Sequence, residues 1–196
     1  MGWSQDWHVV IPHESAKMRW HRPVNSDNFG YSRMMDNQQI ALKLLLDAIG
    51  ESSSIGSVED RLRVQKAVYL AQISGMNLGY PYSWYVKGPY SPALTQDYYK
   101  LNNALASGDN SHLRLVLNPQ LTATAPSVRQ VLQAPPGLQI PKASWYEALA
   151  SIHFLVHYSR YPVDKACGDV RQLKPHLSGI IDAAVLHLRK LGLLPN

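Results

Sequence analysis

The pattern of hydrophobic and polar residues changes near residue 35. Residues 1–33 contain three tryptophans and two prolines but sustain neither a helical nor a strand period. We therefore predict an irregular N-terminal extension over residues 1–33 and a single helical domain over residues 34–196. One interpretation places the natural start at the Met34-Met35 pair. The other makes the extension an arm that binds a partner through its tryptophans.

Two amphipathic patterns predict the first helices of the domain. The first begins at Asp36, has an apolar face and stops at Gly50, a residue type that commonly ends helices. The second covers residues 58–74, and Ser57 followed by acidic residues is a typical helix start. Its apolar residues occupy more than one face, which predicts a central, buried helix: Leu62, Val64, Ala67, Val68, Leu70, Ala71 and Ile73.

A short strand is predicted after the central helix. Residues 82–86 are rich in aromatic and β-branched residues and are bounded by residues that break regular structure. Gly88-Pro89 then predicts a rigid corner, and Ser91-Pro92 predicts the start of a helix that runs to about residue 107. Residues 113–117 alternate, so we predict that they pair with residues 82–86 in a two-stranded ribbon.

The C-terminal part predicts further helices. Residues 118–142 hold five prolines and one short helix, over 127–133. Ser144 and Glu147 fit a capping box that opens a helix to about residue 158. A helix over residues 163–173 and a last helix capped by Ser178 follow. The predicted fold is mainly α, a compact domain of about seven helices with a small two-stranded antiparallel β-ribbon.

Composition narrows the class of protein. Hydrophobic residues make up 45% and charged residues 17% of the chain, as in a globular domain. The single cysteine, Cys167, excludes an internal disulfide and fits a reducing compartment. No secretion signal is recognisable, and the most apolar segment, 145–155, is too short to cross a membrane. We expect a cytoplasmic protein with no membrane contact.

The residues that could carry chemistry are few. His153 and His157 have the helical spacing of zinc ligands, but no glutamate lies between them, so we expect one exposed histidine and one that is hydrogen-bonded at the edge of the core. We interpret Cys167 as a buried thiol. No phosphate-binding loop and no pair of catalytic carboxylates is found. We therefore predict no enzymatic activity, no cofactor and no metal.

Aromatic residues concentrate within residues 80–99, at Tyr80, Tyr82, Trp84, Tyr85, Tyr90, Tyr98 and Tyr99. Such side chains dominate both cores and recognition surfaces. One interpretation is that Trp84 and Tyr90 pack the ribbon onto the helix over residues 58–74, and the other is a binding surface.

A winged-helix DNA-binding regulator is the alternative function, because such a domain is built from helices and a paired ribbon. The helix that begins at Pro92 would then enter the major groove, with Gln96, Lys100, Asn102 and Asn103 as contacts. The net charge of +5 permits this, but the basic residues are scattered, and the helix carries one basic residue.

Two motifs resemble a known bacterial family. Residues 63–72, RVQKAVYLAQ, are similar to K-L-Q-K-x-x-Y-L-x-Q, and residues 84–94, WYVKGPYSPAL, are similar to W-Y-x-Y-G-P-Y-S-x-x-L. These are motifs of the YwgA-like proteins, which are related in motif to the Panacea (SocA-like) antitoxin domains. The resemblance covers residues 36–194, and the chain departs from it at Arg63 and at Lys87.

The resemblance implies a mainly helical domain without catalytic residues, from toxin–antitoxin or phage-defence systems. We therefore predict a non-enzymatic protein-interaction domain, antitoxin-like or an adaptor, whose partner is a protein such as a toxin. The predicted partner-binding residues lie around the Gly-Pro corner: Trp84, Tyr85, Lys87, Gly88, Pro89, Tyr90 and Ser91.

Overall fold

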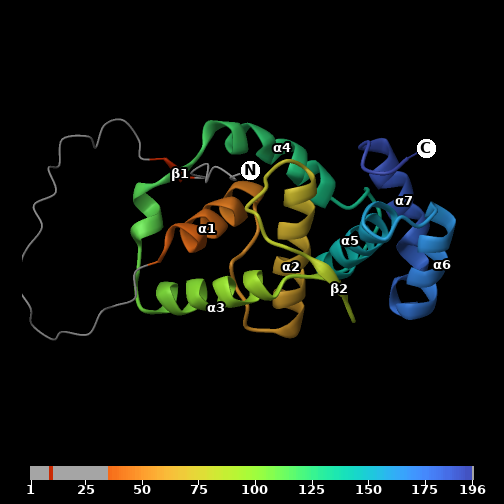
Figure 1. Cartoon of the computed structure of the whole chain (residues 1–196), viewed down its shortest axis with the longest axis horizontal. Coiled ribbons are helices and arrows are strands. Elements are labelled where there is room, and N and C mark those ends of the chain that lie inside the picture. The colour runs from red at the N-terminus through yellow and green to blue at the C-terminus, as the bar shows by residue number, and fades with distance from the viewer. Residues whose placement is uncertain (1–8, 11–34, 196) are drawn as a thin grey trace, which may run out of the picture.

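The computed structural model describes residues 9–10 and 35–195 (Figure 1). Their α-helices are α1 (Asn37–Ile49), α2 (Val58–Ile73), α3 (Pro92–Ala106), α4 (Pro119–Leu132), α5 (Lys142–His157), α6 (Val163–Leu173) and α7 (Ile181–Lys190). The strands are β1 (Val9–Val10), β2 (Ser83–Tyr85), β3 (Gly88–Tyr90) and β4 (Val116–Leu117), and the 3₁₀ helices are η2 (Ser111–Arg114) and η3 (Pro175–Ile180). A mainly α fold with a small antiparallel ribbon is confirmed.

Helix α2 is the central element, as its apolar pattern predicts. Ser57 accepts a hydrogen bond from the Asp60 amide, and the Asp60 side chain accepts one from the Ser57 amide, so a capping box starts the helix. Every residue of α2 from Arg63 to Ala71 is buried. Helix α5 packs along α2, and α4 and β3 also contact it, which explains why this stretch of α2 is shielded from solvent. In Figure 1, α1 and α3 lie on one side of α2 and α5 lies on the other.

The ribbon does not have the predicted partner. Strand β2 pairs with β3, and Val86 and Lys87 form the two-residue turn between them. The segment with alternating residues forms η2 and β4 instead, and β4 pairs with β1. Pairing across a two-residue loop closes the shortest stretch of chain, so the local hairpin forms in place of the distant pairing. The Gly88-Pro89 corner is therefore part of a strand.

Three other helix boundaries differ from the prediction. Helix α4 is twice as long as the predicted short helix, since Pro119 lies in its first turn, where proline is tolerated, and burial of Ala125 and Val128 outweighs the cost of Pro126 inside it. Helix α5 begins at Lys142, so the capping box of Ser144 and Glu147 is wrong. The predicted Ser178 cap is also wrong, because that residue lies inside η3.

The N-terminal extension is described at two residues. Strand β1 occupies Val9–Val10, where an irregular segment was predicted. The other residues of the extension, with its tryptophans and Met34, lie outside the described residues. No helix within residues 35–195 has the length and apolar character needed to span a bilayer.

Candidate functional site

Two glutamines of α2 hold the hairpin segment at its ends. Gln72 donates a hydrogen bond from Nε2 to the Tyr80 carbonyl at 2.9 Å and accepts one from the Tyr80 amide at 3.1 Å. Gln65 does the same at Ser91, with distances of 2.9 Å and 3.0 Å. Each side-chain amide therefore replaces both backbone partners of one residue, as a neighbouring strand would. The segment between Tyr80 and Ser91 is anchored to α2 at both ends.

Two buried lysines hold the tip of the hairpin. Lys66 of α2 donates from Nζ to the carbonyl of Pro89. Lys174, which follows α6, donates from Nζ to the carbonyl of Val86 at 3.1 Å. Each lysine is 1% exposed. Burying an ammonium group is costly unless it is hydrogen-bonded, so these contacts tie the tip closely to the core.

Glu147 neutralises one of these lysines. Its Oε1 accepts a hydrogen bond from Lys174 Nζ at 2.7 Å, and its Oε2 lies 3.2 Å from His176 Nε2. Burial would raise the pKa of Glu147, but the hydrogen bond and the charge of Lys174 outweigh it and hold that pKa below its usual value. Burial lowers the pKa of Lys174, and Glu147 opposes this. The pair is therefore held charged inside the protein.

Lys66 has no such counter-ion among the described residues. Burial, and next the positive charge of Lys174, lower the pKa of Lys66 from 10.5 to about 7. Glu147 acts on it only at longer range and opposes the shift. The hydrogen bond to Pro89 is therefore made by a group that titrates near neutral pH.

The hairpin approaches α5 most closely at Gly88. Its φ is +84°, a left-handed conformation that favours glycine. A Cβ atom built there would lie 2.5 Å from Ser151 Oγ. That hydroxyl is fully buried and has no hydrogen-bond partner among the described residues. Glycine is thus required both by the backbone and by the contact with α5.

Three of the predicted partner-binding residues belong to this support. Gly88, Pro89 and Ser91 are buried, and their backbone groups face α2 and α5. Burial prevents direct contact between these three residues and a partner. They fix the shape of the hairpin instead.

The other predicted residues lie at the surface to different degrees. Tyr85 is 60% exposed, Lys87 is exposed, and Val86 between them, which the prediction omitted, is 74% exposed. Trp84 and Tyr90 are half-buried. The Tyr85 and Tyr90 rings lie 5.5 Å apart. We call Tyr85, Val86 and Lys87 the hairpin tip.

Trp84 and Tyr90 neither pack the ribbon onto α2 nor lie fully open as a binding surface. The Trp84 ring lies 5.9 Å from that of Phe154 of α5, and Lys174 Nζ lies 5.6 Å from its centroid. Tyr90 accepts a hydrogen bond from Thr95 Oγ1 at 2.8 Å. Trp84 therefore attaches the ribbon to α5, while α2 holds it through polar bonds.

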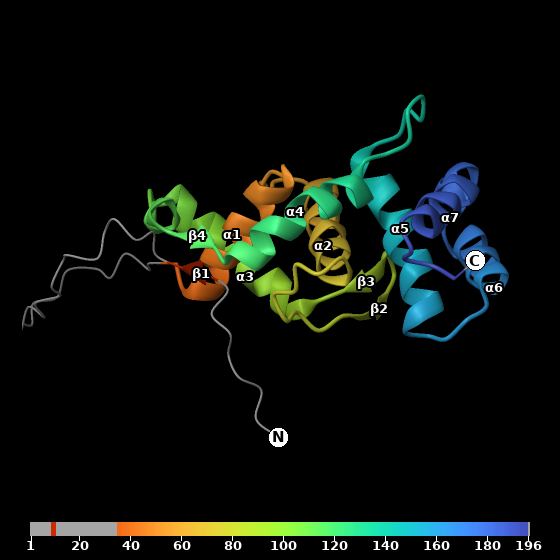
Figure 2. The ribbon, with the colours of Figure 1, turned by 90° about the horizontal axis from the view of Figure 1, so that it is seen from above.

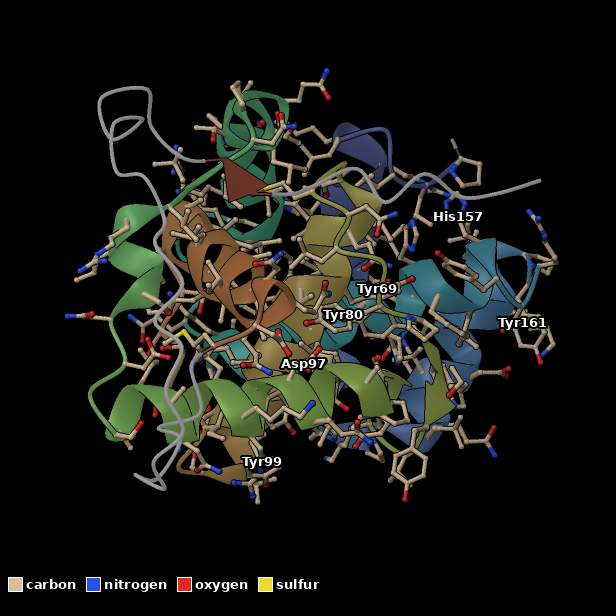
Figure 3. All side chains as sticks on the ribbon, turned by 60° about the vertical axis from the view of Figure 1, so that its left-hand side comes forward. Tyr69, Tyr80, Asp97, Tyr99, His157 and Tyr161 are labelled. Carbon is tan, nitrogen blue, oxygen red and sulfur yellow. The ribbon has the colours of Figure 1, made fainter. Side chains whose placement is uncertain are left out.

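The remaining aromatic residues are divided between core and surface. Tyr80 is buried and donates from its hydroxyl to Asp97 Oδ2 at 3.1 Å, and the two residues are labelled close together in Figure 3. Tyr98 is also buried, whereas Tyr99 is 46% exposed. Clustering of aromatic residues in the sequence therefore does not correspond to one continuous surface.

The two histidines of α5 have the arrangement expected for structural residues. His153 is buried, and its Nδ1 lies 2.8 Å from the Tyr69 hydroxyl. His157, which is labelled in Figure 3, is exposed. It stacks on His153 with ring centroids 4.3 Å apart. Burial, and next the charge of His157, lower the pKa of His153 to about 3. The described residues contain no cluster of three metal-binding side chains.

Cys167 is buried, as predicted, and burial raises the pKa of its thiol.

On α3, Lys100 Nζ lies 3.9 Å from Asp97 Oδ1, so the single basic residue of this helix lies beside an acid. The hairpin also precedes α3 in the chain instead of following it. DNA binding by α3 stays a prediction.

The roles of Lys66, Glu147 and Lys174 were not predicted from the sequence. A signal was present, since Lys66 interrupts the apolar pattern of α2 and Glu147 lies within the most apolar segment of the chain. A charged residue at a buried position needs a partner.

Comparison with family models, curated proteins and solved structures finds no match to this chain. The resemblance to YwgA-like proteins rests on the two motifs and stays a prediction.

Proposed function

We propose that this chain is a non-enzymatic protein-binding domain whose recognition surface is the hairpin tip. The observation that carries the proposal is the contrast within the hairpin. Tyr85, Val86 and Lys87 are exposed side by side, while the backbone beneath them is bonded to two buried lysines.

Rigid presentation of these residues favours binding. Tyrosine is enriched among the residues that dominate interface energies, and an exposed valine adds apolar area. Binding costs less when the surface is already ordered, because fewer side chains and loops lose freedom. The bonds from Gln65, Gln72, Lys66 and Lys174 supply that order before a partner arrives.

We propose further that the chain is an antitoxin-like or adaptor protein of a bacterial toxin–antitoxin or phage-defence system. Support comes from the motifs of the YwgA-like proteins. Gln65, Lys66 and Gln72 lie in the first motif and hold the hairpin, and Gly88 lies in the second. The resemblance thus lies in the residues that present this surface.

Affinity purification of the full chain from its native host, with quantitative mass spectrometry, tests the proposal. Val86→Ser removes apolar surface from the tip, and Val58→Ser removes the same group from the start of α2. The two valines are 74% and 72% exposed, so they form a matched pair. We expect a protein that is enriched with the wild type and with Val58→Ser and is lost with Val86→Ser. Tyr85→Ala should have the same effect as Val86→Ser.

Equal recovery of the partner with Val86→Ser and Val58→Ser would contradict a role of the tip. A monomer without any enriched protein would contradict the function as a whole. Retardation of duplex DNA that weakens steeply with added salt would favour the DNA-binding alternative instead.

A further inference from the structure

Strand β2 has a free backbone edge at Trp84. The register pairs Ser83 with Tyr90, Trp84 with Pro89 and Tyr85 with Gly88. Proline has no amide hydrogen, so Trp84 and Pro89 cannot exchange the two hydrogen bonds of a bonded pair. The flanking pairs, Ser83 with Tyr90 and Tyr85 with Gly88, are therefore the bonded pairs. Bonded and non-bonded pairs alternate in an antiparallel ribbon, so the N–H and C=O of Trp84 point away from β3.

No other described segment covers this edge. The Trp84 backbone makes no hydrogen bond to another described residue outside the ribbon. Figure 2 shows β2 on the outer side of the hairpin, with β3 between it and α2. Ser83 and Tyr85, on either side of Trp84, are both exposed. An open strand edge with unpaired backbone groups is a template for another strand.

We propose that a partner protein binds by adding an extended segment as a third strand beside β2, hydrogen-bonded to the N–H and C=O of Trp84. This inference rests on the proposed function and names its binding mode. Strand addition uses backbone bonds for affinity and alternate side chains for specificity. Alternate side chains of the added strand would lie beside Tyr85 and Ser83, which share one face of β2.

The charges around the hairpin indicate an acidic segment. Three lysines lie at or beneath it, namely Lys66, Lys87 and Lys174, and Glu147 is the acid that lies among them. Lys87 is exposed, so its charge is open to a partner. Complementary charge steers association and selects partners. Lys174 is paired with Glu147, and Lys66 and Lys174 are both buried, so carboxylates beside the added strand would meet the exposed charge of Lys87.

Amide hydrogen exchange of the ¹⁵N-labelled full chain tests the inference. The probe is a capped seven-residue peptide of alternating valine and glutamate. In the free protein the Trp84 amide should exchange quickly and the Tyr90 amide, bonded within the ribbon, slowly. At a free peptide concentration about ten times its dissociation constant, the Trp84 amide should be protected about tenfold. A valine–lysine peptide of the same length should protect it much less.

Two variants separate the backbone edge from the indole. Trp84→Ala and Trp84→Pro both remove the side chain, but only the proline variant removes the outward N–H. We expect the peptide to bind Trp84→Ala and to lose at least about tenfold in affinity for Trp84→Pro, a change equivalent to one or more hydrogen bonds. Slow exchange of the Tyr90 amide in each variant shows that the ribbon is intact.

Three results would overturn the inference. They are an unprotected Trp84 amide at the highest soluble peptide concentration, equal affinity of the two variants, and equal protection by the valine–lysine peptide. Any of these results rejects the added acidic strand. If Val86→Ser still loses a native partner in the purification, the proposed function stands. Loss of the proposed function shows instead as the same set of partners with Val86→Ser and with the wild type.

Discussion

Replacing Lys66 by methionine should remove a pH dependence of stability that the wild-type chain has above neutral pH. The pKa of Lys66 is lowered from 10.5 to about 7 in the folded protein, first by burial. Between these two values the unfolded chain binds more protons than the folded one. The free energy of unfolding therefore rises with pH in this window, and below it Lys66 adds no pH dependence.

The size of the effect follows from the shift. Each pH unit within the window contributes up to about 1.4 kcal/mol. Because the folded pKa lies at the start of the window, the rise between about pH 7 and pH 9 integrates to about 2 kcal/mol. The Lys66→Met variant also loses the hydrogen bond to Pro89, which changes its stability at every pH but adds no titration.

Urea unfolding of both proteins across this pH range, at constant ionic strength, measures the difference. Cys167 and the buried tyrosines titrate in both proteins, so subtraction of the two curves isolates Lys66. We expect the wild-type curve to rise relative to that of Lys66→Met. Parallel curves would show that burial does not lower the pKa of Lys66, and would contradict a buried ammonium group beneath the hairpin.

Three further variants test the support. Glu147→Ala leaves a buried ammonium group without its counter-ion and should lower the free energy of unfolding by about 3–5 kcal/mol in urea. Gly88→Ala should cost about 2 kcal/mol more than Gly79→Ala, because both have a positive φ but only the first meets a side chain, and Ser151→Ala should recover most of that difference. Between about pH 7 and pH 4, the free energy of unfolding of His153→Gln should fall by about 3 kcal/mol less than that of the wild type, since protonation of the unfolded histidine favours unfolding.

Contrary results have distinct meanings. A Glu147→Ala variant as stable as the wild type would mean that the ion pair is solvated. Equal costs of the two glycine substitutions would place the hairpin farther from α5. Identical acid sensitivity of the wild type and His153→Gln, measured by urea unfolding at both pH values, would mean that the imidazole is accessible to protons.

The starts of the first three helices were the most predictable part of the fold. The starts of α1, α2 and α3 follow from Asp36, Ser57 and Ser91, whose side chains accept hydrogen bonds from amides three residues ahead. The Gly50 end of α1 was equally clear. These interactions involve neighbours in the chain, so residue types alone specify them.

The same local rule failed at Glu147. Its spacing from Ser144 fits a capping box, but Lys174 lies 27 residues away in sequence and the ion pair buries the carboxylate in the interior of α5. The predicted ribbon failed for a related reason. Alternation indicates that a segment suits a strand, but the partner depends on which segment reaches it first, and here the two-residue turn brought β3 to β2.

The mainly helical class, the buried position of α2 and the aromatic character of the hairpin follow from periodicity and residue type alone. The bonds from Gln65, Lys66 and Gln72 to the hairpin backbone, and the exposure of Tyr85 and Val86, arise only when the helices pack. A buried polar group needs a partner, but its type and position in the sequence do not say which one. That choice is made when helices distant in the chain pack together.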